Sequence, residues 1–235
     1  MHRRFQIKCK FEMNEQLIKT EKLCKTFRSG RLETPVLFDI DLEIGRGEFA
    51  ALMGPSGCGK STLMHILGLM LRPSAGKIFL EGRDLSNLSE AGRARLRREK
   101  IGFVFQRFNL LGTISAYENI AVAERIRGHQ LDGQVGRVLE AVQMSAKAHC
   151  KPGQLSIGQQ QRIAIARAVV HRPAMVMADE PTGNLDSANA EQVLELLSRI
   201  HREQSVTILM ITHSAAAAKW ADRVIYMNDG RIRNG

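Results

Sequence analysis

A glycine-rich loop holds the residues whose types and spacing point most directly to chemistry. It reads Gly54-Pro55-Ser56-Gly57-Cys58-Gly59-Lys60-Ser61, followed by Thr62, and fits the pattern G-x-x-x-x-G-K-[ST] between a predicted strand and a predicted helix. Glycines let backbone N–H groups approach phosphate oxygens, and the positive end of the following helix attracts anions. Lys60 can contact the β- and γ-phosphates, and Ser61 offers a hydroxyl oxygen to Mg²⁺. The loop predicts a nucleotide site; the alternative is a glycine turn that binds nothing.

Two carboxylates follow a short apolar segment, Met175–Ala178, which is typical of a buried parallel strand. Because ligands bind at the carboxyl ends of such strands, Asp179 is predicted to hold Mg²⁺ and Glu180 to orient or deprotonate a water molecule. The alternative is that both carboxylates only cap the turn that follows. His213 comes after the apolar segment 206–211 and is predicted to contact the γ-phosphate, although a lone histidine is more often structural.

Strands and helices in alternation must position these residues. Apolar and alternating segments predict strands at 17–27, 36–44, 48–53, 76–80, 101–105, 175–178 and 206–211. Helices are predicted at 60–71, from about 89, within 115–150, from about 158 and at 187–203. Ser115 can cap the helix that contains Glu118. This order of elements indicates an α/β fold with a largely parallel core sheet.

The length of 235 residues suits one domain with a small subdomain. Residues 16–235 are interpreted as that domain, and the helix-rich segment at about 107–157 as the subdomain inserted into it. Residues 1–15 are interpreted as a basic N-terminal extension, with disorder as one expectation for them. Met13 is an alternative start of translation, in which case residues 1–12 would not be made.

Charge and composition narrow the choice of partners. The 34 Lys and Arg exceed the 24 Asp and Glu by ten, which favours polyanions. Part of this excess lies in Arg93–Lys100, interpreted as a solvated helix face, with a surface near anionic lipid as the alternative. Aromatic residues make up only 5%, so too few are available to stack on bases and no nucleic acid partner is expected.

Two further observations concern the compartment. No apolar run reaches the roughly 18–20 residues of a membrane-spanning helix, so the chain is not expected to cross a bilayer by itself. The four cysteines lack paired or metal-type spacing and are predicted to be the reduced thiols of a cytosolic protein: Cys9, Cys24, Cys58 and Cys150. Because Cys58 lies inside the phosphate loop, its alkylation is predicted to block nucleotide binding.

The segment Leu155-Ser156-Ile157-Gly158-Gln159 completes an ordered series of motifs. With the phosphate loop before it and MVMADEPTGNLD (175–186) after it, this segment resembles the signature of ATP-binding cassette (ABC) ATPases. The resemblance covers about Leu17 to Gly235. It implies a P-loop NTPase fold of the ABC-ATPase type, with a mainly parallel core sheet, an antiparallel β subdomain and an inserted α-helical subdomain. It also implies hydrolysis of ATP, with Mg²⁺ as the metal.

Two residues acquire roles through the resemblance alone. Phe27 matches an aromatic residue that stacks on adenine; the alternative is a strand residue that packs in the core. Gln106 matches a glutamine that ligates Mg²⁺ and senses the transport partner. The catalytic set implied is therefore Lys60, Gln106, Glu180 and His213, and the metal set is Ser61, Gln106 and Asp179.

The signature implies a second copy of the chain. Ser156, Gly158 and Gln159 match residues that meet the γ-phosphate of ATP held by the other subunit, and Asp186 matches an aspartate that crosses the dimer interface. Two copies are therefore expected to close head-to-tail around two ATP molecules. Ile157 replaces the usual glycine of the signature, which would be strained at positive φ but tolerated in a helix.

Residues 36–49, 102–120 and the segment ADEPTGNLD resemble the LolD, MacB and FtsE group, which serves lipoprotein release, macrolide and peptide export, and cell division. This implies a peripheral location on the cytoplasmic face of the inner membrane, an integral permease with a large extracytoplasmic domain, and no contact with cargo. Phe108–Leu111 is predicted to help form the groove for a permease helix, with ordinary packing as the alternative, and Asp132–Met144 to move with that partner.

Two other classes of protein remain as alternatives. One is a soluble ABC ATPase that acts on nucleic acid or ribosomes, which would usually fuse two cassettes or carry long coiled-coil insertions. The other is a P-loop kinase for a small acceptor, which would need neither Leu155–Gln159 nor His213.

Overall fold

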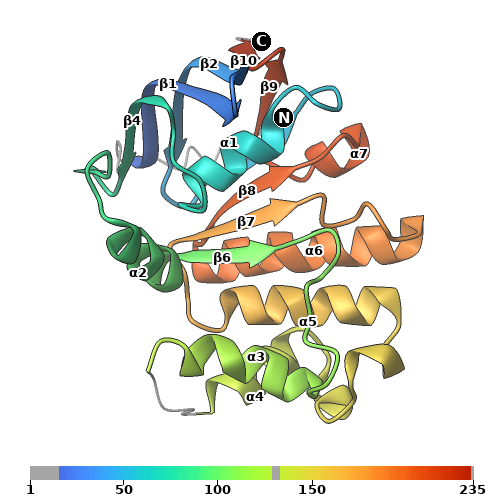
Figure 1. Ribbon diagram of the computed structural model, residues 1–235. Coiled ribbons are helices and arrows are strands. Elements are labelled where there is room, and N and C mark those ends of the chain that lie inside the picture. The colour runs from blue at the N-terminus through green and yellow to red at the C-terminus, as the bar shows by residue number, and fades with distance from the viewer. Residues whose placement is uncertain (1–15, 129–132, 234–235) are drawn as a thin grey trace, which may run out of the picture.

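Two β-sheets and a layer of helices make up the computed structural model, which describes residues 16–128 and 133–233 (Figure 1). The interpretation of residues 1–15 as an extension lies outside the described residues. The smaller sheet is antiparallel, with strand order β2-β1-β4-β5. Its strands are β1 (Gln16–Ser29), β2 (Leu32–Gly45), β4 (Ala75–Leu80) and β5 (Arg83–Asp84).

The core sheet has the strand order β10-β9-β3-β8-β7-β6. Its strands are β3 (Phe49–Met53), β6 (Ile101–Val104), β7 (Met175–Asp179), β8 (Thr207–Ile211), β9 (Arg223–Asn228) and β10 (Arg231–Arg233). Neighbouring strands from β9 to β6 are parallel, and only β10 pairs antiparallel. The predicted parallel core sheet and the antiparallel β subdomain are therefore confirmed.

The helices lie in two places relative to the core sheet (Figure 1). Helix α1 (Lys60–Leu67) lies between the two sheets, and the others pack beyond the opposite face or at the edges. These are α2 (Glu90–Lys100), α3 (Ala116–Arg125), α4 (Gln134–Ala141), α5 (Ile157–Val169), α6 (Ser187–Gln204) and α7 (Ala215–Ala218). No helix in the described part of the chain combines the length and the apolarity needed to cross a lipid bilayer.

Alternate residues of each core strand point to opposite faces of the sheet, as the period of two requires. In β7, Met175 and Met177 pack with α1 and the antiparallel sheet, whereas Val176 and Ala178 pack with α5 and α6. β3 and β8 divide their side chains in the same way. Since both faces are covered, these strands read as continuous apolar runs, which is the pattern that the sequence shows.

One sequence prediction of local structure is wrong, and two strands were not predicted. The helix predicted at 60–71 ends at Leu67, because Gly68 caps it and Leu69 turns the chain into the left-handed region at φ 58°. Strands β9 and β10 are not among the strands predicted from the sequence, because charged and polar residues interrupt their apolar pattern.

The two α-helices of the inserted segment, α3 and α4, each start at a well-defined residue. Ser115 caps α3, and its hydroxyl and the Glu118 carboxylate form the reciprocal capping box expected from the sequence. Gly133, at φ 80°, starts α4. The predicted subdomain, 107–157, contains α3, α4 and two 3₁₀ turns, and α5 begins at its end.

The arginines of the basic helix α2 make two different kinds of contact. Arg93 is buried and donates to the carbonyl oxygen of Leu71 at 2.6 Å, while Arg97 donates to that of Leu69 at 2.7 Å. These bonds fasten α2 to the chain just after α1. The interpretation of the run as a solvated face is therefore wrong for these two residues, and it holds for Arg95, which is exposed and pairs with Glu99 on the same helix at 2.9 Å.

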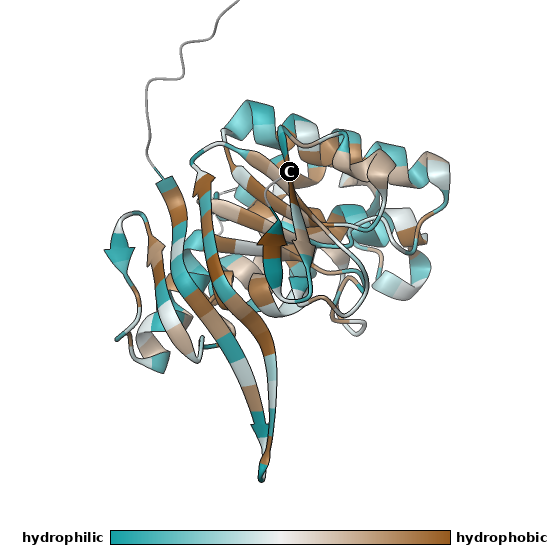
Figure 2. Ribbon diagram, turned by 90° about the horizontal axis from the view of Figure 1, so that it is seen from above, coloured by the Kyte–Doolittle hydropathy of each residue, from teal (hydrophilic) through white to brown (hydrophobic). Residues whose placement is uncertain are grey.

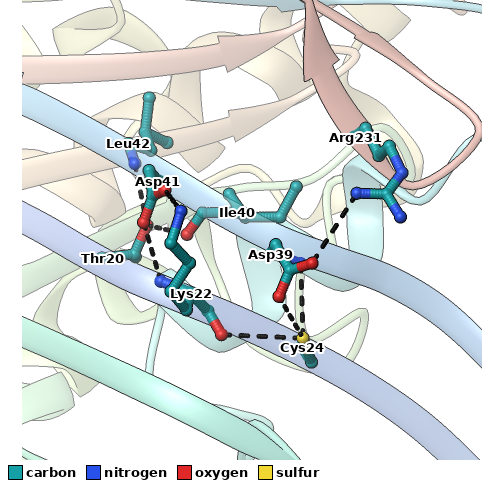
Figure 3. Close-up of polar contacts among 8 residues, drawn as sticks. All are labelled: Thr20, Lys22, Cys24, Asp39, Ile40, Asp41, Leu42 and Arg231. Carbon is teal, nitrogen blue, oxygen red and sulfur yellow. Dashed lines mark hydrogen bonds and ion pairs between the residues drawn. The ribbon is translucent and has the colours of Figure 1, made fainter.

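A buried hydroxyl joins β1 to β2 where both strands are irregular (Figure 3). The Thr20 hydroxyl donates to the Ile40 carbonyl at 2.9 Å and accepts from the Leu42 N–H at 3.0 Å. Lys22 and Asp39 adopt positive φ nearby, so the ladder is interrupted there. Thr20 satisfies backbone groups that would otherwise be buried without partners.

We expect Thr20→Val to destabilise the fold by about 1–3 kcal/mol, because valine has the same shape but leaves two buried backbone groups unpaired. Urea unfolding followed by circular dichroism measures this difference. The control is Thr34→Val on the exposed part of β2, which should lie within about 0.5 kcal/mol of the parent. Equal stability of the two variants would contradict the role given to the hydroxyl.

Candidate functional site

The phosphate loop joins β3 to α1, and its backbone conformation requires glycine. Gly57 and Gly59 adopt left-handed conformations at φ 78° and 103°. A side chain at Gly59 would also approach Leu37 Cδ2 to 2.8 Å, and one at Gly54 would overlap the carbonyl oxygen of Met227. The loop is thus pressed against β2 and β9, so that its shape is fixed by packing as well as by glycine.

Lys60, the first residue of α1, is buried within the loop. Its ammonium donates to the carbonyl oxygens of Gly54 and Pro55, both at 2.8 Å. The start of α1 has no side-chain cap and no acidic residue in its first turn, so its N–H groups are available to an anion. A cation and uncapped helix amides at one point form a phosphate-binding arrangement.

A cleft of about 500 Å³ opens over this loop. It is lined by Val36, Ser56, Gly57, Gly59, Lys60, Ser61, Thr62, Glu180 and His213. The structure therefore brings together the predicted loop, the predicted base and the predicted histidine, although they come from three separate parts of the chain. Each belongs to the carboxyl end of a core strand: β3, β7 or β8.

Asp179 ends β7 and Glu180 begins the following turn. Burial raises the pKa of the Asp179 carboxyl, and repulsion from Glu180 raises that pKa further. Glu180 adopts φ 44°, and its N–H donates to the Ile211 carbonyl at 3.0 Å. The imidazole Nδ1 of His213 lies 3.2 Å from Glu180 Oε1, so these two side chains are already in contact.

Gln106 reaches the acidic pair from the segment after β6. A Cβ at Gly183 would lie 2.8 Å from Gln106 Nε2 and 3.3 Å from Glu180 Oε2, so the amide and the carboxylate both lie close to this glycine. The Asn184 amide donates to the Gln106 carbonyl at 2.8 Å. Asn184 was missed by the sequence analysis, although it lies four residues after Glu180 in a motif that was singled out.

A metal ion at this site would depend on mixed oxygen ligands. The residues described contain no group of three His, Cys, Asp or Glu side chains that could hold a metal. The predicted set, Ser61, Gln106 and Asp179, instead supplies one hydroxyl, one amide and one carboxylate. Hard oxygen donors in small number, completed by water and phosphate oxygens, are what Mg²⁺ takes in nucleotide sites.

The signature segment forms the start of α5. Ser156 caps this helix and forms a capping box with Gln159. Ile157 is the first helical residue and has no positive φ, so the strain considered for an isoleucine here is not present. Its side chain is 51% exposed.

Asp186 lies beside the signature. It caps α6 by accepting from the Asn189 N–H at 2.8 Å, and that bond lowers the pKa of its carboxyl. A side chain at Gly158 would approach Asn189 Oδ1 to 2.7 Å. The signature and Asp186 therefore share one surface, and none of their residues lines the cleft over the phosphate loop.

Phe27 and Cys58, both predicted to contact ATP, do not line this cleft. Phe27 is on the part of the β1–β2 hairpin that projects from the rest of the molecule (Figure 2), 41% exposed, with the Lys25 ammonium 5.0 Å from its ring centroid. The alternative that it packs in the core is therefore wrong. Cys58 is a free thiol, 6% exposed, with its Sγ atom 3.8 Å from Lys60 Nζ.

Comparison with known proteins agrees with this arrangement. The ABC transporter family model matches residues 37–183. The macrolide export ATP-binding/permease protein MacB of Syntrophobacter fumaroxidans is 45% identical over 221 residues, which are 92% of this chain and 31% of the relative. The chain thus spans about a third of the length of this curated relative.

Solved structures of similar fold are also ATP-binding cassettes. A dimeric, post-hydrolysis structure of the ATP-binding cassette MJ0796 bound to ADP and Pi has a TM-score of 0.84 and 35% identity, covering 92% of this chain and 97% of that one. CbiO1 of Clostridium perfringens, part of the transporter complex CbiONQ, has a TM-score of 0.83 and 28% identity, covering 94% and 88%. The family match covers well over half of the sequence, and the chain therefore belongs to the ABC transporter family.

Proposed function

We propose that this ABC ATPase is the ATP-hydrolysing subunit of a membrane transporter and that two copies close head-to-tail around two ATP molecules. The observation that carries the proposal is the separation of two incomplete half-sites on one chain. The cleft over the phosphate loop lacks signature residues, while Ser156 and Gly158 lie at the start of another helix, beside Asp186. A second copy would bring its signature to the first copy's cleft. Dimers of similar cassettes support this reading.

Each half-site residue then has a chemical role. ATP with Mg²⁺ supplies the γ-phosphoryl group that water attacks. Lys60 and the amides of the loop would bind the phosphates. Ser61, Gln106 and Asp179 would hold the metal, which would neutralise charge on the phosphates. Glu180 would orient the water and accept its proton. His213, whose Nδ1 lies 3.2 Å from Glu180 Oε1, would contact the γ-phosphate and help to hold that carboxylate in place.

A second surface, an apolar groove, has the properties of a docking site for the permease. A groove of about 570 Å³ is lined largely by apolar side chains, among them Met70, Phe103, Phe105, Val122 and Ile126. Met70 and Ile126 are 39% and 59% exposed. The groove also includes Asn109 of the predicted docking segment. Large exposed apolar side chains in a groove mark a protein contact, here a cytoplasmic helix of the permease.

The docking segment is held in place by one arginine. Arg167 of α5 donates to the carbonyl oxygens of Phe108 and Asn109, both at 2.7 Å, and these two residues adopt positive φ. Gln106 precedes this segment by two residues. A permease helix in the groove would therefore lie next to the residue that reaches the metal site.

The similarity to a macrolide export ATP-binding/permease protein supports an exporter. We propose one of the lipoprotein-release, macrolide or peptide type, with a permease that carries a large extracytoplasmic domain. Such a subunit would lie peripherally on the cytoplasmic face of the inner membrane. Cargo would contact the permease and not this chain.

We expect Glu180→Gln to keep ATP binding and trap a dimer while lowering hydrolysis by about 10²–10⁴-fold, the usual contribution of a positioned base. Phosphate release and size-exclusion chromatography with ATP and Mg²⁺ measure both properties. Hydrolysis at the parent rate would show that Glu180 is not the base.

Lys60→Ala is expected to act at an earlier step, because it removes the cation that lies within the phosphate loop. It should weaken ATP binding by at least about tenfold, and no ATP-dependent dimer should form at ATP concentrations that saturate Glu180→Gln. Titration with a fluorescent ATP analogue measures the affinity. Unchanged affinity would remove Lys60 from the binding site.

The groove is tested with tagged Glu180→Gln protein purified from native membranes with ATP and Mg²⁺. We expect an integral permease to be recovered, and Ile126→Glu in the same background to lose it, because a charge would be buried in the apolar contact. Leu32→Glu, on the exposed tip of the hairpin, is the control and should retain the permease. Recovery of ribosomes or nucleic acid without a membrane protein would contradict the transporter assignment and leave the ATPase chemistry in place.

A further inference from the structure

A buried glutamine connects the signature helix to the loop that carries Glu180. Gln161 of α5 is fully buried, and its Nε2 donates to the carbonyl oxygen of Pro181 at 2.7 Å. Pro181 is itself buried and directly follows Glu180. The two elements joined by this bond are otherwise separated by 20 residues of sequence.

The other end of the same amide is left without a partner. Gln161 Oε1 is buried and accepts no hydrogen bond among the described residues. Turning the amide over would place this oxygen against the Pro181 carbonyl oxygen, where two acceptors repel, so the orientation is determined. An unpaired buried acceptor is unfavourable, and an apolar residue of similar volume would avoid that penalty. Packing alone therefore does not account for a glutamine here.

Three consecutive glutamines at this point bond in different directions. Gln159 accepts from the Ser156 N–H, and Gln160 donates to the Leu155 carbonyl at 3.1 Å, so both stay within the signature segment. Only Gln161 reaches out of that segment to the loop after β7. It lies one helical turn after Gly158, on the first turns of a helix whose start carries the signature.

The loop that Gln161 holds is constrained on every side. Glu180 has a left-handed backbone, its N–H is bonded to Ile211, and its carbonyl accepts from the Gly183 N–H at 3.0 Å. For a glutamate this backbone is uncommon and must be kept by its surroundings. The Pro181 carbonyl belongs to the peptide between Pro181 and Thr182, so the bond from Gln161 fixes the chain one residue beyond the base.

We propose that Gln161 is a positioning residue that couples the signature helix to the general base, so that a shift of α5 moves the Glu180 carboxylate relative to the water it activates. The inference rests on the proposed role of Glu180. Gln161 does not line the cleft over the phosphate loop, and its side-chain amide donates to the Pro181 carbonyl. Its effect is therefore on the rate of hydrolysis and not on the binding of ATP.

The test variant is Gln161→Met, which keeps the length and volume of the side chain and removes the donor. We expect kcat for ATP to fall about tenfold, which corresponds to about 1.4 kcal/mol in the activation barrier, while KM changes less than about twofold. Thr20→Val is the matched control, since it also removes a buried side-chain donor to a backbone carbonyl, here a hydroxyl that does not line the cleft. It should lower Tm at least as much as Gln161→Met and leave kcat unchanged.

Two results would overturn the inference. One is a lower Tm for Gln161→Met with unchanged kcat at a temperature where the variant is folded, since this means that the bond only stabilises the fold. The other is a raised KM with unchanged kcat, which would assign Gln161 to nucleotide binding.

A double variant separates this inference from the role of Glu180. If Gln161 acts through the base, Gln161→Met should add less than about twofold to the loss in Glu180→Gln. Full additivity contradicts the coupling. Parent-like hydrolysis by Glu180→Gln alone contradicts the proposed function instead, whatever Gln161→Met does.

Discussion

The burial of α1 between two sheets is the constraint on which the cleft over the phosphate loop depends. Its apolar residues Leu63, Met64, Ile66 and Leu67 pack against both the antiparallel strands and the core strands. Because the helix cannot shift, the loop before it has one path, and the glycines permit it. The bonds from Arg93 and Arg97 to the turn after α1 fix the other end of the same helix. The shape of the phosphate loop thus depends on the packing of α1 against both sheets.

The parallel order of the core strands gathers the remaining chemistry. β3, β7 and β8 are adjacent and parallel, so the residues after them meet at one edge although up to about 150 positions separate them in sequence. The left-handed backbone of Glu180 is the point where this edge departs from low-energy geometry. Strain of that kind is kept where surrounding contacts outweigh it, and here Ile211, Gly183 and Gln161 supply those contacts.

Much of this could be predicted from the sequence because the motifs are local. The phosphate loop, β7 with its carboxylates and the Ser115 cap each depend on neighbouring residues, and all three were located correctly. What was missed depends on distant contacts. The end of α1, the carbonyl partners of Arg93 and the bond from Gln161 to Pro181 join segments that only the fold brings together. Phe27 shows a further limit, since an alternating strand pattern does not reveal that the hairpin leaves the core.

The helix caps at Ser156 and Asp186 affect the entropy change when two copies associate. Ser156 and Asp186 already have their side chains fixed by the N–H groups of Gln159 and Asn189. A partner that contacts this surface would meet a rigid turn and would not need to order it first. Ordering a flexible side chain on association costs about 0.5–1.5 kcal/mol. Here these side chains are already ordered in the folded monomer, so association does not incur this cost again. Closure of two copies would then depend chiefly on the ATP molecules bound between them.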